Sequence, residues 1–357
     1  MGEEFLDKAR AVRAGEEIDS LPFLDFLKER LADYPGEIEI LQFPGGYSNL
    51  TYLIKKGASE FVLRKPPLGA NIKSAHDMGR EFKVLSLLQP SYDKIPAPIC
   101  YYEENDLIGA PFFMMERVKG LILRNKVPDG LSMTKNAFRK LSENTIDNLA
   151  NLHQIDIKVS GLDTLGKPEG YVKRQVEGWI KRYFNAETDV IEAMNETATW
   201  MQDNIPPDVT PAFIHNDYKY DNLVLDPESL EIKALLDWEM ATVGDPLMDL
   251  GTSLGYWAEQ GDHPALKSFG LTGHDGNLSR QELVERYAIT SGRKVEHIVF
   301  YYVFGCFKIA VIAQQIYARF KKGLTKDPRF GGLIYVTNAC AENAANAIKF
   351  NRINNFK

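Results

Sequence analysis

Hydrophobic residues in the first third of the chain recur with two periods, one helical and one typical of strands. Residues 19–31 ("DSLPFLDFLKERL") open on an Asp/Ser helix start and then repeat apolar residues at helical spacing, which predicts an amphipathic helix. The stretches "EIEILQF", "LTYLI" and "EFVLRK" predict three strands, joined by the turns "PGGYSN" and "KKGAS". Residues 75–89 predict a second helix, and "PAPICYYEE" with "GAPFFMMERV" predicts a β-hairpin.

Beyond "ERVKG" the hydrophobic pattern becomes mainly helical. The stretches "AFRKLSENTIDNLANLHQI" and "YVKRQVEGWIKRYF" each place apolar residues on one helical stripe. Short β patterns return only in "PAFI", "NLVLD" and "EIKALLDW", and helices resume at "DPLMDLGTSLGYW". We therefore predict an α+β chain with a β-rich domain over residues 1–117 and a mainly helical domain over residues 118–357.

Composition narrows the class of protein. A length of 357 residues with 44% hydrophobic and 25% charged residues is typical of a globular chain with two lobes. The formal net charge of −7 provides no basic field, so we expect neither nucleic acid nor a membrane as partner. The apolar run of residues 298–307 is too short to span a bilayer before Lys308, which indicates a buried helix.

The cysteines and the first residues indicate the compartment. The three cysteines are far apart and lack CxxC spacing, which favours a reducing compartment without a zinc site. The stretch "MGEEFLDKAR" has early acids and no apolar core, so it does not resemble a secretory signal. We expect a cytoplasmic protein, and the sequence leaves its oligomeric state open.

The stretch "FIHNDYKYDNLVLD" (residues 213–226) gathers candidate chemistry between two β-prone ends. His215, Asp217 and Asn222 share this loop, and Asp237 ends the apolar "ALLD". Carboxylate and amide oxygens are ligands that Mg²⁺ prefers, and a further carboxylate can accept the proton of a hydroxyl. A turn that is only capped by its own Asp and Asn side chains is the alternative.

The spacing of this loop resembles a known family. "HNDYKYDN" is similar to the protein-kinase catalytic loop H-R-D-x-K-x-x-N, and "LLDWE" stands where the metal-binding D-F-G would. The resemblance is closer to the aminoglycoside phosphotransferase and choline kinase-like family. Together with "FVLRKPPLG" and "IGAPFFMMERVKG", it is closest to the phosphotransferase domains fused to some acyl-CoA dehydrogenases. It implies a bilobal protein kinase-like fold with a small β-rich, nucleotide-binding N-lobe and a larger helical C-lobe, and ATP and Mg²⁺ as cofactors.

The resemblance also implies roles for single residues. Asp217 would be the catalytic base, His215 a support of the loop backbone, and Asn222 and Asp237 the Mg²⁺ ligands. Asp249 is similar to a helix aspartate that anchors such a loop from behind, and Asn216 replaces the glycine common in this branch. By contrast, we interpret His153 as a helix-end histidine whose ring is satisfied by backbone groups.

A kinase needs a cation on the sheet of its first lobe, held by a carboxylate on a helix. Arg64 and Lys65 in "EFVLRK" point to opposite faces because side chains alternate along a strand, so only one can serve. Alignment of "FVLR" with the V-A-I-K strand of protein kinases predicts that Arg64 contacts the phosphates and Val62 the adenine. Glu81 would then be the helix carboxylate that pairs with Arg64.

Two further segments complete the predicted nucleotide site. In "GGYSNLTY" we expect Gly46 to permit close approach of the backbone, and Ser48 and Asn49 to donate hydrogen bonds to phosphates. A glycine hairpin turn without a ligand is the alternative. The backbone from Glu116 to Val118 would bind the adenine edge, whereas the preceding pair of methionines can equally be simple core.

The predicted function is ATP- and Mg²⁺-dependent phosphotransfer to an alcohol group of a small molecule, with hydroxyacyl-CoA the leading acceptor class. Alternatives are an aminoglycoside or other amino-alcohol kinase, nucleotidyl transfer, a nucleotide-binding pseudokinase-like module and a metallohydrolase. A CoA acceptor would need a local cationic rim on this acidic protein. Residues 317–330 offer five cations, although a solvated helix end is the alternative.

Overall fold

A computed structural model of the chain describes residues 5–44, 49–67, 77–268, 270–325 and 327–356. It divides into two compact units. The first unit comprises Met1–Ile122, Val224–Ser229 and Lys233–Glu239, and the second comprises Leu123–Leu223, Leu230–Ile232 and Met240–Lys357. The division after Ile122 lies beyond the expected boundary at residue 117, because the backbones of Leu121 and Leu225 exchange two hydrogen bonds of 2.8 Å.

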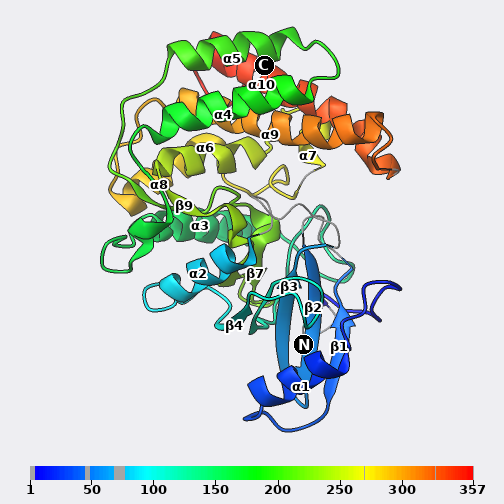
Figure 1. Cartoon of the computed structure of the whole chain (residues 1–357). Coiled ribbons are helices and arrows are strands. Elements are labelled where there is room, and N and C mark those ends of the chain that lie inside the picture. Colours follow the sequence, from blue (N-terminus) through cyan, green and yellow to red (C-terminus); the bar gives the residue numbers. More distant parts are fainter. Residues whose placement is uncertain (1–4, 45–48, 68–76, 269, 326, 357) are drawn as a thin grey trace. The chain divides into compact units, whose positions relative to one another are not determined.

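The first unit is built on an antiparallel five-stranded sheet of order β1-β2-β3-β5-β4 (Figure 1). Aromatic rings of the leading helix pack edge-on against Phe112 of the sheet, which buries the apolar face that the sequence pattern predicts. The elements are α1 (Leu21–Arg30), β1 (Ile38–Gln42), β2 (Leu50–Lys56), β3 (Ser59–Lys65), α2 (Met78–Leu88), β4 (Pro98–Tyr102) and β5 (Phe112–Glu116).

The second unit is mainly helical, and α4, α5, α9 and α10 pack side by side (Figure 1). Helices α6 and α9 meet at Gly251 and Gly305, where a Cβ atom on either glycine would collide with the backbone of the other helix. The helices are α3 (Lys135–Leu152), α4 (Tyr171–Ala186), α5 (Glu192–Asp203), α6 (Pro246–Tyr256), α7 (Pro264–Lys267), α8 (Arg280–Ser291), α9 (Ile298–Lys321) and α10 (Leu333–Phe350), with short 3-10 turns at Leu162–Leu165 and Pro328–Gly332.

Short strands surround the predicted catalytic loop. The loop runs from β6 (Ala212–Ile214) through a 3-10 turn at Tyr220–Asn222 into β7 (Leu223–Leu225), which pairs with β8 (Ile232–Leu235). After a 3-10 turn at Trp238–Met240, β9 (Thr242–Gly244) pairs with β6. The sequence pattern did not predict β9, because three residues are too few to show a period.

Helix α9 is the one described helix that is long and apolar enough to cross a membrane by length and composition. Within the structure, 78% of its apolar window is buried against other parts of the protein. The prediction of a buried helix over this run is therefore confirmed. The prediction of an α+β chain with a β-rich first part and a helical second part is also confirmed.

Candidate active site

The loop after β6 is held from behind by one buried aspartate. Asp249, on α6, accepts hydrogen bonds from the backbone N–H groups of His215 (2.6 Å) and Asn216 (2.8 Å). Burial opposes ionisation of Asp249, but hydrogen bonds from His153 and from the His215 backbone outweigh it and lower the pKa of this carboxyl group. The contact of Asp249 with the loop is the one that the family resemblance predicts.

The turn of the loop has an unusual backbone conformation. Asn216 has a φ of 67°, in the left-handed region that glycine adopts without strain and asparagine tolerates better than most residues. This conformation explains why asparagine can stand where the family branch commonly has glycine. The Nδ1 atom of the fully buried His215 accepts the Asp217 N–H at 3.2 Å, so His215 supports the loop backbone.

The Asp217 carboxylate is oriented by two neighbours on the same loop. Lys219 Nζ lies 2.8 Å from Asp217 Oδ2, and Asn222 Nδ2 donates to the same oxygen at 3.1 Å. Burial opposes the charge on Lys219, but Tyr256, Asp217 and Asp221 raise the pKa of this lysine, so Lys219 stays protonated. The Asp217 side chain is 16% exposed. It is therefore positioned as a proton acceptor for a small polar group.

Two lysines of this site were given no role from the sequence. Lys219 stands two residues after Asp217 on the same bent loop, and this short separation of opposite charges could have indicated their pairing. Lys308 of α9 donates a 2.6 Å hydrogen bond from its buried Nζ to the Asn216 carbonyl oxygen. In the sequence, the feature that could have indicated a role for Lys308 is a charge at the end of an apolar run. In the structure, burial lowers the pKa of Lys308 to about 8.

The interpretation of His153 was wrong in one respect. It does end helix α3, but its ring contacts side chains rather than backbone groups. Nδ1 lies 2.7 Å from the Tyr287 hydroxyl and Nε2 lies 3.2 Å from Asp249 Oδ2. Sequence distance hid this contact, because 96 residues separate His153 from Asp249. His153 therefore belongs to the buried support of the loop.

In the first unit, Arg64 bridges two carboxylates. Arg64 Nη1 lies 2.5 Å from Glu81 Oε1, and Nη2 lies 3.1 Å from Asp237 Oδ1. Lys65 points the other way and donates to the Ile108 carbonyl oxygen at 2.7 Å, as strand alternation predicts. Burial raises the pKa of Glu81 to about 7 despite the opposing effect of Arg64. Within the described residues, Arg64 Nε and Glu81 Oε2 are buried without hydrogen-bond partners, so this cluster can accept further polar contacts.

Other predicted nucleotide contacts are placed less completely. Val62 lies in β3, half-buried and two residues before Arg64. Asn49 is buried and donates to Glu239 at 3.3 Å. Gly46 and Ser48 lie outside the described residues, so their roles stay predictions.

The segment after β5 offers one backbone donor for an adenine. The N–H groups of Glu116 and Arg117 donate to Ala97 and Glu60, at 2.9 and 3.1 Å. The Val118 N–H has no hydrogen bond to any residue that the structure describes. Val118 is therefore the better placed donor of the predicted pair. The methionines before it, Met114 and Met115, are buried.

The proposed Mg²⁺ ligands fall in different units, Asp237 in the first and Asn222 in the second. Asp237 is 35% exposed at a φ of 69°, just after β8, and Asn222 directs its amide nitrogen to Asp217. A carboxylate and an amide oxygen fit Mg²⁺, which keeps several waters and binds few protein groups. Across the residues that the structure describes, no three His, Cys, Asp or Glu side chains cluster as a metal cage.

Comparison with known proteins places this geometry in a family. The sequence profile described as "Phosphotransferase enzyme family" matches residues 39–283. The chain is 33% identical over 314 residues to human "Acyl-CoA dehydrogenase family member 11", covering 85% of this chain and 40% of that protein. It is 32% identical over 291 residues to mouse "Acyl-CoA dehydrogenase family member 10", covering 80% of this chain and 27% of that protein. The chain thus spans two fifths or less of the length of these two relatives.

Solved structures agree with the profile. An aminoglycoside phosphotransferase-type protein of Ralstonia eutropha is 26% identical with a TM-score of 0.80, covering 94% of this chain and 99% of that one. Choline kinase of Cryptosporidium parvum, 13% identical with a TM-score of 0.57 over 92% of this chain and 98% of that one, shares the fold. The predicted resemblance is confirmed: the chain belongs to the phosphotransferase enzyme family, whose protein kinase-like fold it shares.

Proposed function

We propose that this protein transfers the terminal phosphoryl group of ATP, with Mg²⁺, to a hydroxyl group of a small molecule. The observation that carries the proposal is the Asp217 loop. Its carboxylate is held by Lys219 and Asn222, and its backbone is fixed by Asp249. A carboxylate that is both positioned and accessible is what a hydroxyl nucleophile requires.

In this proposal each part of the site has one task. The oxygen of the acceptor hydroxyl bonds to the terminal phosphorus of ATP, and ADP leaves. Asp217 accepts the proton that this hydroxyl loses. Arg64 of the first unit binds phosphate oxygens, and Glu81 orients it. Bound Mg²⁺, held through Asp237 and Asn222, would neutralise charge on the phosphates. His215 would contribute by supporting the loop, since its ring is buried behind it.

A hydroxyacyl-CoA is the acceptor class that we favour, because curated relatives are named as acyl-CoA dehydrogenase family members. An aminoglycoside or amino-alcohol acceptor is the alternative, supported by the names of the structural neighbours. The predicted cationic rim has weaker support. Lys321 pairs with Asp189 at 3.0 Å, Arg329 pairs with Asp327, and Lys326 lies outside the described residues.

We further propose a cytoplasmic location without nucleic-acid partners. The three cysteines are free and buried, which suits a reducing compartment. The net charge of −7 gives no attraction to polyanions. Fractionation of cells that express the tagged chain would test the location, and recovery with membranes or nucleic acid would contradict it.

Asp217→Asn tests the central proposal. The substitution keeps the shape of the side chain and removes the proton acceptor, so transfer should fall about 10³-fold while the affinity for Mg²⁺-ATP is kept. The measurement is ADP release over a panel of hydroxyl acceptors, beside a nucleotide titration. Asp203→Asn, an exposed change on α5, is the matched control. Near-normal turnover of Asp217→Asn would refute the assigned base.

A further inference from the structure

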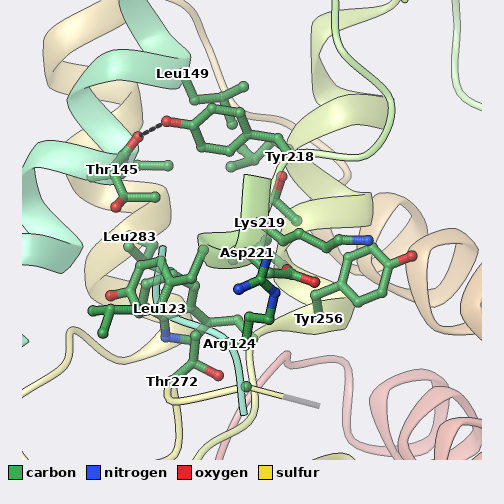
Figure 2. A pocket seen from close by; sticks show the side chains of 17 residues that line it. Leu123, Arg124, Thr145, Leu149, Tyr218, Lys219, Asp221, Tyr256, Thr272 and Leu283 are labelled. Atoms are coloured by element: carbon green, nitrogen blue, oxygen red, sulfur yellow. Dashed lines mark hydrogen bonds between the residues drawn. The ribbon is translucent and has the colours of Figure 1, made fainter. Parts of the chain in front are cut away.

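A pocket with largely apolar walls opens beside the Asp217 loop, within the second unit (Figure 2). Its cavity volume is about 40 Å³, within about 590 Å³ of space between atoms that is counted out to open solvent. Its walls come from α3, α6 and α8 and from the segments next to them. The apolar side chains that line it include Leu123, Ile146, Leu149, Leu250, Leu254 and Trp257.

The pocket lies next to the proposed base, Asp217, through two residues that contact or neighbour it. Lys219 and Tyr256 line it, and Figure 2 shows the lysine side chain extending toward the tyrosine ring. Lys219 Nζ lies 4.9 Å from the centre of that ring and 2.8 Å from Asp217 Oδ2. A substrate whose hydroxyl group reaches Asp217 would therefore have this pocket directly beside it.

One polar side chain of the pocket is unsatisfied. Ser253, on α6, is 9% exposed, and its buried Oγ has no hydrogen-bond partner within the described part of the chain. Its neighbour Thr252 instead donates to the Met248 carbonyl oxygen at 2.8 Å, as helix hydroxyl groups commonly do. A buried hydroxyl without a partner destabilises a fold unless a ligand supplies one.

Charge at the pocket is confined to a few side chains. Arg124 is exposed, and Figure 2 places it with Asp221 and Lys219 on one side of the pocket. The remaining walls offer no carboxylate to a cationic ligand, since Asp221 is the one acid among the described lining residues. A polycationic acceptor would lose its hydration there without compensation, whereas an alkyl chain would gain from burial.

We propose that this pocket binds an uncharged, apolar chain of the phosphate acceptor, and that Ser253 Oγ donates a hydrogen bond to an oxygen atom on that chain. The inference rests on the proposed function, because it assumes that the acceptor hydroxyl lies at Asp217. It adds where the chain of the acceptor binds and which group recognises it: a pocket for an aliphatic acyl or alkyl chain, with Ser253 at a carbonyl-type oxygen, and not a site for an aminosugar.

Binding of acyl-N-acetylcysteamine thioesters that lack a hydroxyl group tests the pocket without phosphotransfer. With short, medium and long saturated chains, calorimetry should show the wild-type affinity rising up to about fourfold per methylene until the pocket is filled. Ser253→Ala should weaken binding about fivefold at every length and raise the melting temperature of the unliganded protein slightly, because it removes a buried hydroxyl without a partner. Ser253→Ile should remove the dependence on chain length by filling the space.

The matched control is Ser86→Ile, at an exposed position of α2, which should leave all affinities unchanged. If Ser253→Ile does not fold, the wild-type protein is photocrosslinked with a thioester that carries a photoreactive group at the end of its chain. The crosslinks should map to α3 or α6. Affinities independent of chain length, or crosslinks elsewhere, would overturn the pocket assignment. Ser253→Ala with unchanged affinity would overturn the serine contact.

The same thioesters with a hydroxyl group separate the pocket from the proposed function. Their phosphorylation, measured as Mg²⁺-ATP-dependent ADP release, should show kcat/KM that rises with chain length in the wild type and not in Ser253→Ile. Binding that depends on chain length without phosphorylation of any hydroxyl acceptor would refute the proposed function and leave the pocket standing. Phosphorylation of kanamycin in preference to every hydroxyacyl thioester would overturn the pocket proposal.

Discussion

The two units each bury a carboxylate on a helix, and the two carboxylates are satisfied very differently. Asp249 of α6 accepts two backbone N–H groups and the His153 ring, and its pKa is lowered. Glu81 of α2 has a single cationic partner and one oxygen without a hydrogen bond among the described residues, and burial raises its pKa to about 7.

The difference shows that burial alone does not decide the charge of a carboxyl group. At Asp249 several donors and the neighbouring histidines outweigh the loss of hydration, whereas at Glu81 a shared cation and the backbone N–H of Trp238 do not. We infer that the carboxylate of Asp249 has its hydrogen bonds within the protein and serves to support the loop. The cluster of Arg64, Glu81 and Asp237 instead leaves Arg64 Nε and Glu81 Oε2 without hydrogen-bond partners among the described residues, which fits the phosphate-binding role proposed for it.

Asp249→Asn should have the largest effect, because the amide cannot accept from both backbone groups and His153 as the carboxylate does. We expect a loss of about 3–5 kcal/mol in the free energy of unfolding, measured by denaturant titration. Exposed Asp203→Asn should stay within about 0.5 kcal/mol of the wild type. An unchanged Asp249→Asn titration would show that the loop does not need this anchor and would remove the contrast between the units.

Arg64→Ala should weaken Mg²⁺-ATP binding about 100-fold, because it removes the charge-assisted phosphate contact. Arg64→Ala should lower the free energy of unfolding less than Asp249→Asn does, since Glu81 can take up a proton when it loses its cationic partner. Lys65→Met is the comparison, because Lys65 contacts the Ile108 carbonyl oxygen and should affect stability rather than nucleotide affinity. The reverse order of nucleotide affinities would transfer the phosphate role to Lys65.

Lys308→Met tests whether the support of the loop extends to α9. The Asn216 carbonyl oxygen would lose its 2.6 Å contact, so we expect kcat to fall about tenfold with little change in KM for ATP. Steady-state ADP release gives both parameters, and exposed Lys349→Met on α10 serves as control. A change in KM for ATP with kcat intact would argue against a role in positioning the loop.

Glu81→Gln should have the smallest effect. It should appear as a change in how the free energy of unfolding depends on pH. Because the pKa of Glu81 rises from 4.5 to about 7 on folding, the folded state holds more protons than the unfolded state between these values. Stability from this group is fully present below pH 4.5, decreases as pH rises through about 7, and is flat above it. The difference in unfolding free energy between wild type and Glu81→Gln should follow this course. A difference that does not vary with pH would mean that folding does not change the pKa of Glu81.

Much of the fold could be predicted from the sequence, because hydrophobic periodicity reports local geometry. The strands of the five-stranded sheet and helices α1, α2, α3, α4 and α6 lie where the patterns predict them. The placement of Arg64 and Lys65 on opposite faces follows from strand alternation alone. The order and spacing of His215, Asp217 and Asn222, together with Asp237 and the β-rich part preceding the helical part, predicted the family, which the comparisons confirm.

Tertiary structure decided the contacts between residues far apart in the chain. The pairing of β6 with β9, the contact of His153 with Asp249, and the reach of Lys308 to Asn216 join segments that no local pattern relates. The unsatisfied Ser253 hydroxyl is likewise invisible in a helical repeat, because its environment is made by other elements. Periodicity records which face of an element is buried, whereas the partner on that face depends on how the whole chain packs.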